Sequence, residues 1–484
     1  MFKEHPAGLR VLFMTEMWER FSYYGMRGIL ALFLVAAIET GGFGMDKTTA
    51  GAIYGLYTAM VYLLALPGGW VADRILGQRR AVFLGGIFIA AGQFTLVIPN
   101  IVTFYFGLML IIIGTGLLKP NVSTIVGDLY PEGGARRDAG FSIFYMGINV
   151  GALIGPIICG YLGENINWHL GFSAAGFGML FGLLQYKLGE KRFGEAGKLK
   201  GNAAETKGEA IKSLYKGLGG VVVLAAVIAG LQLSGIIHIT LNGLAQTTGV
   251  IIVGMAILYF AYVLFFGHLT SQEKKRVVVI FFLFVGAALF WSGFEQAGSS
   301  MNFFAKELTD RMIAGMEMPA SWLQSVNPLF IIIFAPMFGS LWVWLAQRKK
   351  EPSIPAKFGL GLLLLGVAFL VMAWASLYAS ETHKVSPAWL VVTYFLQTTG
   401  ELCLSPVGLS SVTKLSPQKY VGQMMGIWFM GAALGNLIAG LVGGQFELLP
   451  LPELFGSVAL TTAGAGLVFL IFTKPIKKLI GGIQ

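Results

Sequence analysis

Residues 15–27 read TEMWERFSYYGMR and place four charged side chains inside the first apolar stretch of the chain, which covers residues 10–36. A charged side chain at the centre of a bilayer costs roughly 2.5–3.5 kcal/mol on insertion scales, so one that is retained there mostly faces a cavity. On an α-helix, residues three and four positions apart share one face. The residues on this face are Glu16, Glu19, Arg20, Tyr23 and Arg27, with Tyr24 at its edge. We predict that the face lines an aqueous cavity; the alternative is a ladder of ion pairs that holds helices together.

The chain has the composition of an integral membrane protein. Its 484 residues are 56% hydrophobic and only 12% charged, and its mean hydropathy is +0.73. An ordinary soluble domain is about one quarter charged. The two cysteines, Cys159 and Cys403, lie in separate apolar runs with no partner at metal-ligand spacing. We therefore predict neither a disulfide framework nor a metal site, and we expect no cofactor.

Apolar windows long enough to cross a bilayer, about 20 residues each, fall into three groups. The first group covers residues 10–36, 48–72, 79–98, 102–125, 139–162 and 169–188. The second covers residues 217–237 and 246–267. The third covers residues 276–297, 321–346, 356–378, 387–411, 420–444 and 455–473. This pattern predicts an all-α integral membrane fold with fourteen spans, in the order six, two and six.

Between the first two groups the chain becomes polar and rich in glycine and lysine, without apolar periodicity. We read this stretch as a solvated linker. The expected units are an N-terminal six-helix bundle, a cytoplasmic linker, two accessory helices and a C-terminal six-helix bundle. They cover residues 1–190, 191–216, 217–268 and 269–484, in that order.

The basic residues of the predicted loops gather on one side of the membrane when both chain ends are placed there. They include Arg74, Arg79, Arg80, Arg136, Arg137, Lys274, Lys275, Arg276, Arg348, Lys349, Lys350, Lys474, Lys477, Lys478 and the whole linker. The other side keeps only Lys47, Lys306, Arg311 and Lys384. By the positive-inside rule both termini are predicted to be cytoplasmic, and the net charge of +10 needs no nucleic-acid partner.

Two six-helix bundles joined by a linker are the layout of transporters built from repeats, with the substrate site between the bundles. A channel would more often be a symmetric oligomer around a filter, and the chain shows no filter-like segment.

Three further charges stand inside predicted spans, namely Lys119, Glu295 and Glu401. Together with the first span they make three cations against four carboxylates. One carboxylate is therefore unmatched if all are ionised, and an unmatched buried carboxylate takes up a proton. Glu401 has no cation within its own span, which favours a cavity-facing role over an internal structural pair. The charges inside the spans thus supply the groups that proton coupling requires.

At these residues the chain resembles the proton-dependent oligopeptide transporter (POT) family of the major facilitator superfamily, in the bacterial form with two extra helices. EMWERFSYYG at 16–25 matches the family signature E-x-x-E-R-F-x-Y-Y-G in full, and FSIFYMGINVGAL at 141–153 is similar to its fifth-span signature. GGWVADRILGQRR at 68–80 resembles the cytoplasmic gating loop of the superfamily. Similar family segments are GTGLLKPNVS, FEQAGSS and ELCLSPVGLS in the fourth, seventh and tenth core spans. The resemblance covers nearly the whole chain.

The resemblance implies a major facilitator fold and proton-driven import of di- and tripeptides by alternating access, with the proton as coupling ion. It assigns proton coupling to Glu16, Glu19, Arg20, Lys119 and Glu295. It assigns substrate binding to Arg27, Tyr23, Tyr24, Tyr62, Lys119, Asn149, Trp291, Asn327, Glu401, Ser405 and Trp428, and gating to Asp73 and Arg74. Arg27 and Lys119 would attract the carboxylate of the peptide, and Glu401 its amino group.

The resemblance also implies a multi-pass protein of the bacterial inner membrane that works as a monomer in the lipid bilayer. Some relatives carry a histidine after a second-span tyrosine that has been considered for proton binding. Here the pair reads Tyr54 and Gly55, so coupling is expected to depend on the carboxylates.

Two alternatives remain open. A carrier of the same fold could move another small anionic or zwitterionic solute, although a pure anion carrier has no use for Glu401. A membrane-embedded enzyme would need a nucleophile or a metal set. The chain contains neither G-x-S-x-G nor H-E-x-x-H, and its five histidines fall at termini, loops or span ends, so we predict that it is not an enzyme.

Overall fold

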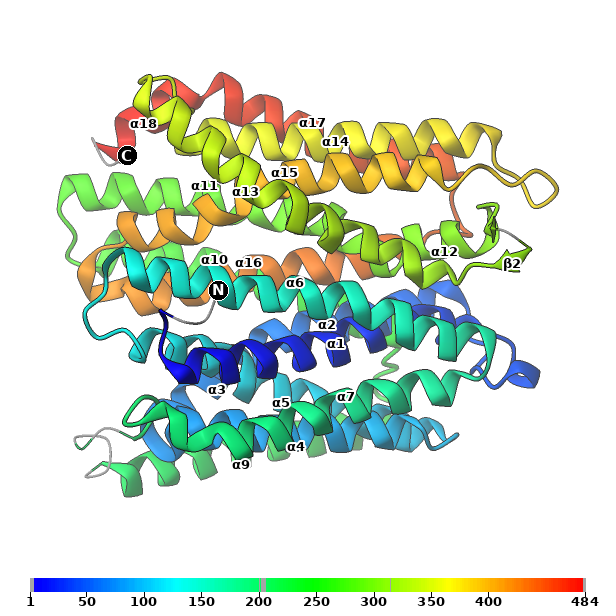
Figure 1. Cartoon of the computed structure of the whole chain (residues 1–484), viewed down its shortest axis with the longest axis horizontal. Helices are drawn as coiled ribbons and strands as arrows, with labels where there is room; N and C mark the ends of the chain where they lie inside the picture. Colours follow the sequence, from blue (N-terminus) through cyan, green and yellow to red (C-terminus); the bar gives the residue numbers. More distant parts are fainter. Residues whose placement is uncertain (1–3, 200, 202–205, 314, 482–484) are drawn as a thin grey trace.

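The computed structural model describes residues 4–199, 201, 206–313 and 315–481. Within these residues the chain is almost entirely helical, with one short antiparallel hairpin of β1 (Met312–Ile313) and β2 (Met316–Glu317). In Figure 1, α1 (Ala7–Val35) begins and α18 (Thr473–Ile480) ends toward the left, whereas the hairpin lies at the right. The helical body therefore begins and ends at the same end of the molecule, as an even number of spans requires.

The N-terminal bundle is formed by α1 and the helices that follow it. They are α2 (Lys47–Leu63), α3 (Ala65–Val71), α4 (Gln78–Leu96), α5 (Ile101–Asp128), α6 (Gly134–Asn165) and α7 (Trp168–Gly189), with a short turn η1 (Ile38–Thr40) after α1. The second predicted span is α2 and α3 together, interrupted at Leu64. Pro67 explains the interruption, because a proline within a helix removes one backbone hydrogen bond.

The C-terminal bundle contains two spans that are less regular than predicted. The seventh core span is α11 (Ser271–Phe294), a 3-10 turn η4 (Glu295–Gly298) and α12 (Ser300–Glu307). The eighth begins as a 3-10 helix, η5 (Ala320–Ser325), and continues as α13 (Val326–Gln347). The remaining helices are α14 (Ile354–Tyr378), α15 (Ala388–Leu415), α16 (Val421–Gly443) and α17 (Leu451–Ile471), with η6 (Gln418–Tyr420) before α16.

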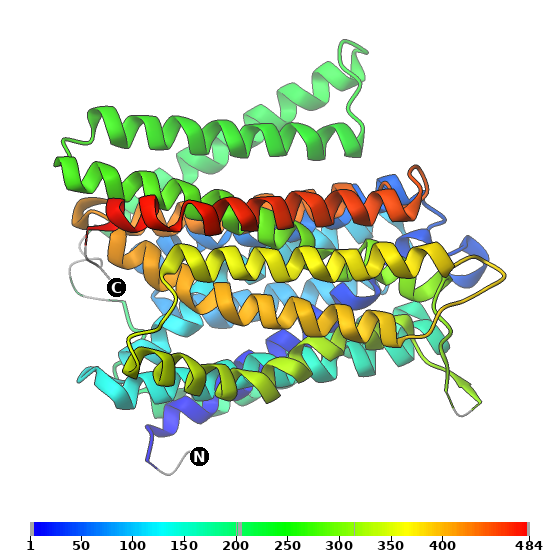
Figure 2. The same ribbon diagram turned by 90° about the horizontal axis from the view of Figure 1, so that it is seen from above.

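Two accessory helices, α9 (Lys207–Leu233) and α10 (Leu241–Phe266), connect the bundles. Figure 2 shows them as a green hairpin along one side of the molecule. α10 packs on α2 and α16, whereas α9 is exposed along almost its whole length. One sequence expectation is wrong here, because residues 207–216 are not linker but the first turns of α9. The apolar part of the segment propagates helix backward through Lys, Glu and Ala, which are good helix formers.

The described residues thus contain fourteen long helical segments in the order six, two and six, which confirms the predicted architecture. Ten of them qualify as membrane spans on length and apolar composition alone. The other four are α1, α4, α7 and α15, and they pack against helices that do qualify. α1 differs from an ordinary span because it carries the charged face predicted from residues 15–27.

Polar side chains end several of the loops by capping the next helix. Asp46 accepts hydrogen bonds from the backbone N–H and the hydroxyl of Thr49, at 2.8 Å and 2.7 Å, and so begins α2. These hydrogen bonds lower the pKa of Asp46 below its usual value. Asn100 and Asn167 cap α5 and α7 in the same way.

The bundles meet most closely where α2 crosses α16. Gly51 and Gly55 of α2 face Gly440 and Gly444 of α16 at four-residue spacing on both helices. A Cβ atom added at Gly55 would lie 2.8 Å from the carbonyl oxygen of Leu437, so the two backbones are in direct contact. Small residues permit such close approach between membrane helices, and any side chain there would separate them.

We predict that Gly440→Leu separates the bundles at this crossing and lowers, by roughly tenfold or more, the peptide uptake that the family resemblance implies. Overpacking of about 1–3 kcal/mol acts against the closed arrangement and shifts its equilibrium by about 5- to 150-fold. The matched control is Gly219→Leu in α9, where an added Cβ meets nothing within 4 Å. Initial uptake rates in proteoliposomes measure the effect, and equal rates for the two variants would contradict the prediction that uptake needs this close crossing.

Candidate functional site

The charged face of α1 is buried as a compact cluster. Arg20 Nε lies 2.7 Å from Glu16 Oε1 and 2.9 Å from Glu19 Oε2, and the three side chains are at most 5% exposed. Neither carboxylate oxygen of Glu19 makes a hydrogen bond of good geometry with a described residue. Tyr23 covers the cluster on one side, with its ring centroid 5.8 Å from the guanidinium carbon of Arg20. Two carboxylates therefore share one guanidinium, and their negative charge is only half compensated by that contact.

Arg27, about two turns after Arg20 on the charged face, reaches across to the other bundle. Its Nη1 atom lies 2.6 Å from Oε2 of Glu295, and the two side chains are 6% and 5% exposed. The hydroxyl of Tyr54 donates to the backbone carbonyl of Glu295 at 3.3 Å. Tyr24 lies beside the guanidinium, and its ring centroid is 5.1 Å from the guanidinium carbon of Arg27. Residues to which the resemblance assigns different roles, substrate binding and proton coupling, thus form one ion pair between the bundles.

Lys119 lies near the buried carboxylates, but its ammonium group contacts an aromatic ring. Its Nζ atom lies 3.7 Å from the ring centroid of Tyr62, and it forms no ion pair with a described residue. Pro120 follows it inside α5, and the side chain of Asn121 donates to the carbonyl of Leu117 at 2.7 Å. A lysine held only by a cation–π contact has ammonium hydrogens to spare for an anionic partner.

Glu401 lies on α15, where α13 passes beside it. Asn327 of α13 donates from Nδ2 to Oε2 of Glu401 at 3.2 Å and to the hydroxyl of Thr398 at 2.8 Å. The Glu401 side chain is buried, and no described cation pairs with it. Asn327 therefore orients the carboxylate without neutralising it, and Glu401 remains an acceptor for a cationic group.

The other predicted pocket residues are placed less distinctively. Asn149 is buried on α6 and donates to the carbonyl of Tyr145 within its own helix, at 3.0 Å. Trp291 packs edge-on against neighbouring rings of α11. Trp428 of α16 is 6.3 Å from Phe358, centroid to centroid, and Ser405 is half-buried on α15. Their contacts here are those of helix packing, and their substrate role stays a prediction.

The predicted gating loop is a π-helical turn, η2 (Ala72–Leu76), that ends at Gly77 with φ of 77°. Asp73 accepts a hydrogen bond from Gln78 Nε2 at 2.7 Å, and Arg74 is exposed. Sequence reasoning missed how this loop is held. Arg79 donates to the carbonyls of Ala196 and Gly194, so the start of the linker is bound to the gating loop rather than solvated throughout.

A second group that sequence reasoning missed joins the bundles at the hairpin end of the molecule. Lys47, the first residue of α2, is buried and pairs with Glu307 at 2.7 Å and Glu447 at 3.0 Å. Lys306 pairs with Glu164 at 3.0 Å, and the same carboxylate accepts from the backbone N–H of Ala320. The sequence contains one indication of these ion pairs: Lys47 and Lys306 are two of only four cations predicted on their side of the membrane.

Hydrogen bonds and ion pairs between the bundles therefore gather toward the hairpin end. They begin at Arg27 and Glu295 and continue outward through Asn302, which donates to the carbonyl of Gly28 at 2.8 Å. Ser325 donates to the carbonyl of Leu153 at 2.8 Å. The cluster of Glu16, Glu19 and Arg20 lies on the other side of this seam, toward the end where α1 begins. As for metals, the described residues contain no group of three histidine, cysteine or acidic side chains placed to hold an ion.

Comparison with known proteins gives one consistent result. The sequence model of the POT family matches residues 79–453. The peptide transporter YePEPT of Yersinia enterocolitica is 42% identical over all of this chain and 97% of its own length. The di-/tripeptide transporter of Lactococcus lactis subsp. cremoris is 37% identical over all of this chain and 98% of its own. Among solved structures, a peptide transporter POT in complex with sulfate is 41% identical, with a TM-score of 0.90 over 100% of this chain and 97% of that one.

Proposed function

Because the chain belongs to the POT family, we propose that it is a proton-coupled symporter that imports di- and tripeptides by alternating access. It is a membrane transporter of the major facilitator fold and not an enzyme. The single observation that carries the proposal is the buried ion pair of Arg27 with Glu295, which joins the two bundles at 2.6 Å. One protonation at this pair changes both the contact between the bundles and the availability of a guanidinium for substrate.

The proposed substrate site recognises the amino group and the carboxylate at the two ends of a peptide. A zwitterionic peptide carries a cation and an anion at a fixed span, and opposite charges on the site complement it whatever its side chains are. Lys119 has no described carboxylate partner and Arg27 is released when Glu295 takes a proton, so both are assigned to the peptide carboxylate. Glu401, held by Asn327 and facing no described cation, is assigned to the peptide amino group. Aromatic walls at Tyr23, Tyr24, Tyr62, Trp291 and Trp428 then admit varied side chains.

The proposed coupling step begins with proton binding at the carboxylates. A proton on Glu295 removes the charge that holds Arg27, and the guanidinium turns to the peptide carboxylate. A proton on Glu16 or Glu19 frees Arg20 in the same manner, because these two share it at 2.7 Å and 2.9 Å. Lys119 lies on the adjacent helix α5. It then pairs either with the remaining carboxylate of the cluster, in place of Arg20, or with the carboxylate of the peptide. Breaking a buried pair costs about 3–5 kcal/mol unless a new partner compensates, which ties proton, peptide and bundle movement together.

The proposed location is the bacterial inner membrane, with both termini in the cytoplasm. The chain is a multi-pass membrane protein, and the bias of basic loops toward one side supports the orientation. In that orientation the hairpin end is extracellular, so the seam of inter-bundle bonds describes a state closed to the outside. We propose that a monomer in the bilayer is the working unit, since the assigned residues all come from one chain.

Competition in proteoliposomes tests the proposed substrate class. Counterflow of labelled dialanine is expected to be inhibited by unlabelled dialanine and trialanine and unaffected by alanine, whose two charges are too close to reach both ends of the site. N-acetyl-dialanine, which lacks the amino cation, is expected to inhibit poorly. Inhibition by a dicarboxylate but not by trialanine would instead support a same-fold carrier of another anionic solute.

A further inference from the structure

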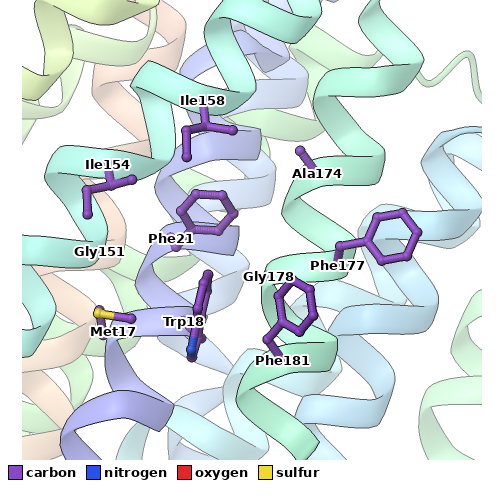
Figure 3. A pocket seen from close by; sticks show the side chains of 10 residues that line it. All are labelled: Met17, Trp18, Phe21, Gly151, Ile154, Ile158, Ala174, Phe177, Gly178 and Phe181. Atoms are coloured by element: carbon purple, nitrogen blue, oxygen red, sulfur yellow. The ribbon is translucent and has the colours of Figure 1, made fainter.

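An apolar groove runs over the outer face of the N-terminal bundle, away from the proposed peptide site. It lies between α1, α6 and α7 and encloses about 290 Å³. Figure 3 shows Met17, Trp18 and Phe21 of α1 at its base, with α6 on one side and α7 on the other. Its lining is almost wholly apolar. We call it the α1–α6–α7 groove.

Two glycines shape the base of the groove. At Gly151 of α6, an added Cβ would lie 2.9 Å from the Cβ of Arg20, so α6 contacts α1 directly there. Gly178 of α7 receives the ring of Phe21 in the space that a side chain would occupy. The rim is exposed, with Ile154 at 38%, Phe177 at 53% and Phe181 at 54%. The groove therefore opens outward to the surroundings of the helices, not inward to the seam.

The surroundings at this depth are lipid. The groove is formed by the middle turns of α1, α6 and α7, and a cavity with apolar walls does not hold water. Its size is near the lower end of small-ligand sites, which begin at about 300 Å³. A narrow apolar channel of this kind fits part of an acyl chain.

Three cations lie beyond one end of the groove. Arg10 is exposed and shares a helix face with Met17 and Trp18, about 10 Å away along α1. Lys191 and Arg192 are also exposed and belong to the short turn η3 (Glu190–Phe193), which packs against the start of α1. None of the three cations forms an ion pair with a described residue. One lipid leaflet spans about 15 Å of hydrocarbon, so Arg10 stands near the headgroup level when the groove holds the chain.

We propose that the α1–α6–α7 groove binds an anionic phospholipid, with an acyl chain along Met17, Trp18 and Phe21 and the phosphate at Arg10. In the orientation given above the lipid comes from the cytoplasmic leaflet, whose anionic lipids attract basic residues at the surface. The bound chain lies on the back of the helix turns that carry Glu16, Glu19 and Arg20 on their other face. The lipid thereby supports the packing of α1 on α6 behind the coupling cluster. Lipid binding at the groove goes beyond peptide transport and is independent of it.

Quenching of Trp18 by brominated lipids tests the proposal without any transport assay. The protein is reconstituted in vesicles containing either dibrominated phosphatidylglycerol or dibrominated phosphatidylcholine, in wild-type form and as Trp18→Phe. The difference between the two proteins isolates the emission of Trp18 from that of the other tryptophans. We expect the difference signal to be half-quenched at about a fivefold lower mole fraction of the anionic lipid, because one basic residue near the surface contributes about that factor.

Arg10→Gln is expected to remove most of this preference, whereas the matched control Lys350→Gln, an exposed lysine in the loop before α14, keeps it. Equal quenching by the two lipids in the wild type overturns the proposal and leaves ordinary annular lipid. A preference that survives Arg10→Gln overturns the assigned headgroup contact. If neither lipid quenches Trp18 while other tryptophans are quenched, the groove is covered by protein, such as a second copy of the chain, and the proposal is overturned. The comparison of the two lipids needs only the wild type and Trp18→Phe, so it decides the matter even if Arg10→Gln folds poorly.

Discussion

Glu295→Gln is expected to abolish gradient-driven accumulation of dialanine while downhill exchange of dialanine persists. Glu295 holds Arg27 across the bundles at 2.6 Å, and glutamine keeps the shape of the side chain without a group that takes up a proton. Movement of the bundles then no longer depends on protonation at this pair. The accumulation ratio should fall from roughly fiftyfold at 100 mV for one coupled proton to about one.

The control for this prediction is Glu453→Gln, an exposed carboxylate in the first turn of α17. It removes the same charge from the same bundle without touching the pair, and it should accumulate dialanine like the wild type. If Glu295→Gln still concentrates dialanine under a gradient, Glu295 is not an obligatory coupling group. The cluster of Glu16, Glu19 and Arg20 would then carry coupling alone.

Glu401→Gln is expected to weaken dialanine binding by at least about 30-fold, because loss of one partner from a buried charge-assisted contact costs about 2–5 kcal/mol or more. The effect should fall on the amino end of the peptide. In counterflow, the wild type discriminates dialanine from N-acetyl-dialanine, and the variant should discriminate between them far less. The Asn327 contact at 3.2 Å survives the change because glutamine retains an acceptor oxygen.

Glu381→Gln, in the exposed loop before α15, is the matched control for Glu401. It should leave both the affinity for dialanine and the discrimination unchanged. If Glu401→Gln lowers affinity for both compounds equally, the residue supports the fold of α15 and does not contact the amino group.

The features that could be predicted from the sequence are those that depend on residues close together in the chain. Apolar windows of about 20 residues indicate the positions of the fourteen long helices, although only ten of these qualify as spans on length and apolar composition alone. The helical face of Glu16, Glu19, Arg20 and Arg27 follows from spacing alone, and the structure keeps it on one buried face. Glu401 has no cation within its own span, and its predicted role with the peptide amino group stays a prediction.

The features that could not be predicted are contacts between residues far apart in the chain. Arg27 and Glu295 are 268 positions apart, and nothing local to either marks the other as its partner. The same holds for Lys47, whose partners Glu307 and Glu447 lie in the other bundle. Composition misled at residues 207–216, where a polar stretch is helical because it continues an apolar helix.

The measurement that tests the central claim most directly is the steady-state accumulation of labelled dialanine in proteoliposomes under an imposed inward proton gradient. The account predicts accumulation well above the external concentration, toward roughly fiftyfold per coupled proton at 100 mV. It predicts a fall to equal concentrations when a protonophore collapses the gradient. Accumulation that never exceeds the external concentration, in protein verified to be folded and inserted, or accumulation that the protonophore leaves unchanged, would contradict proton-coupled peptide import.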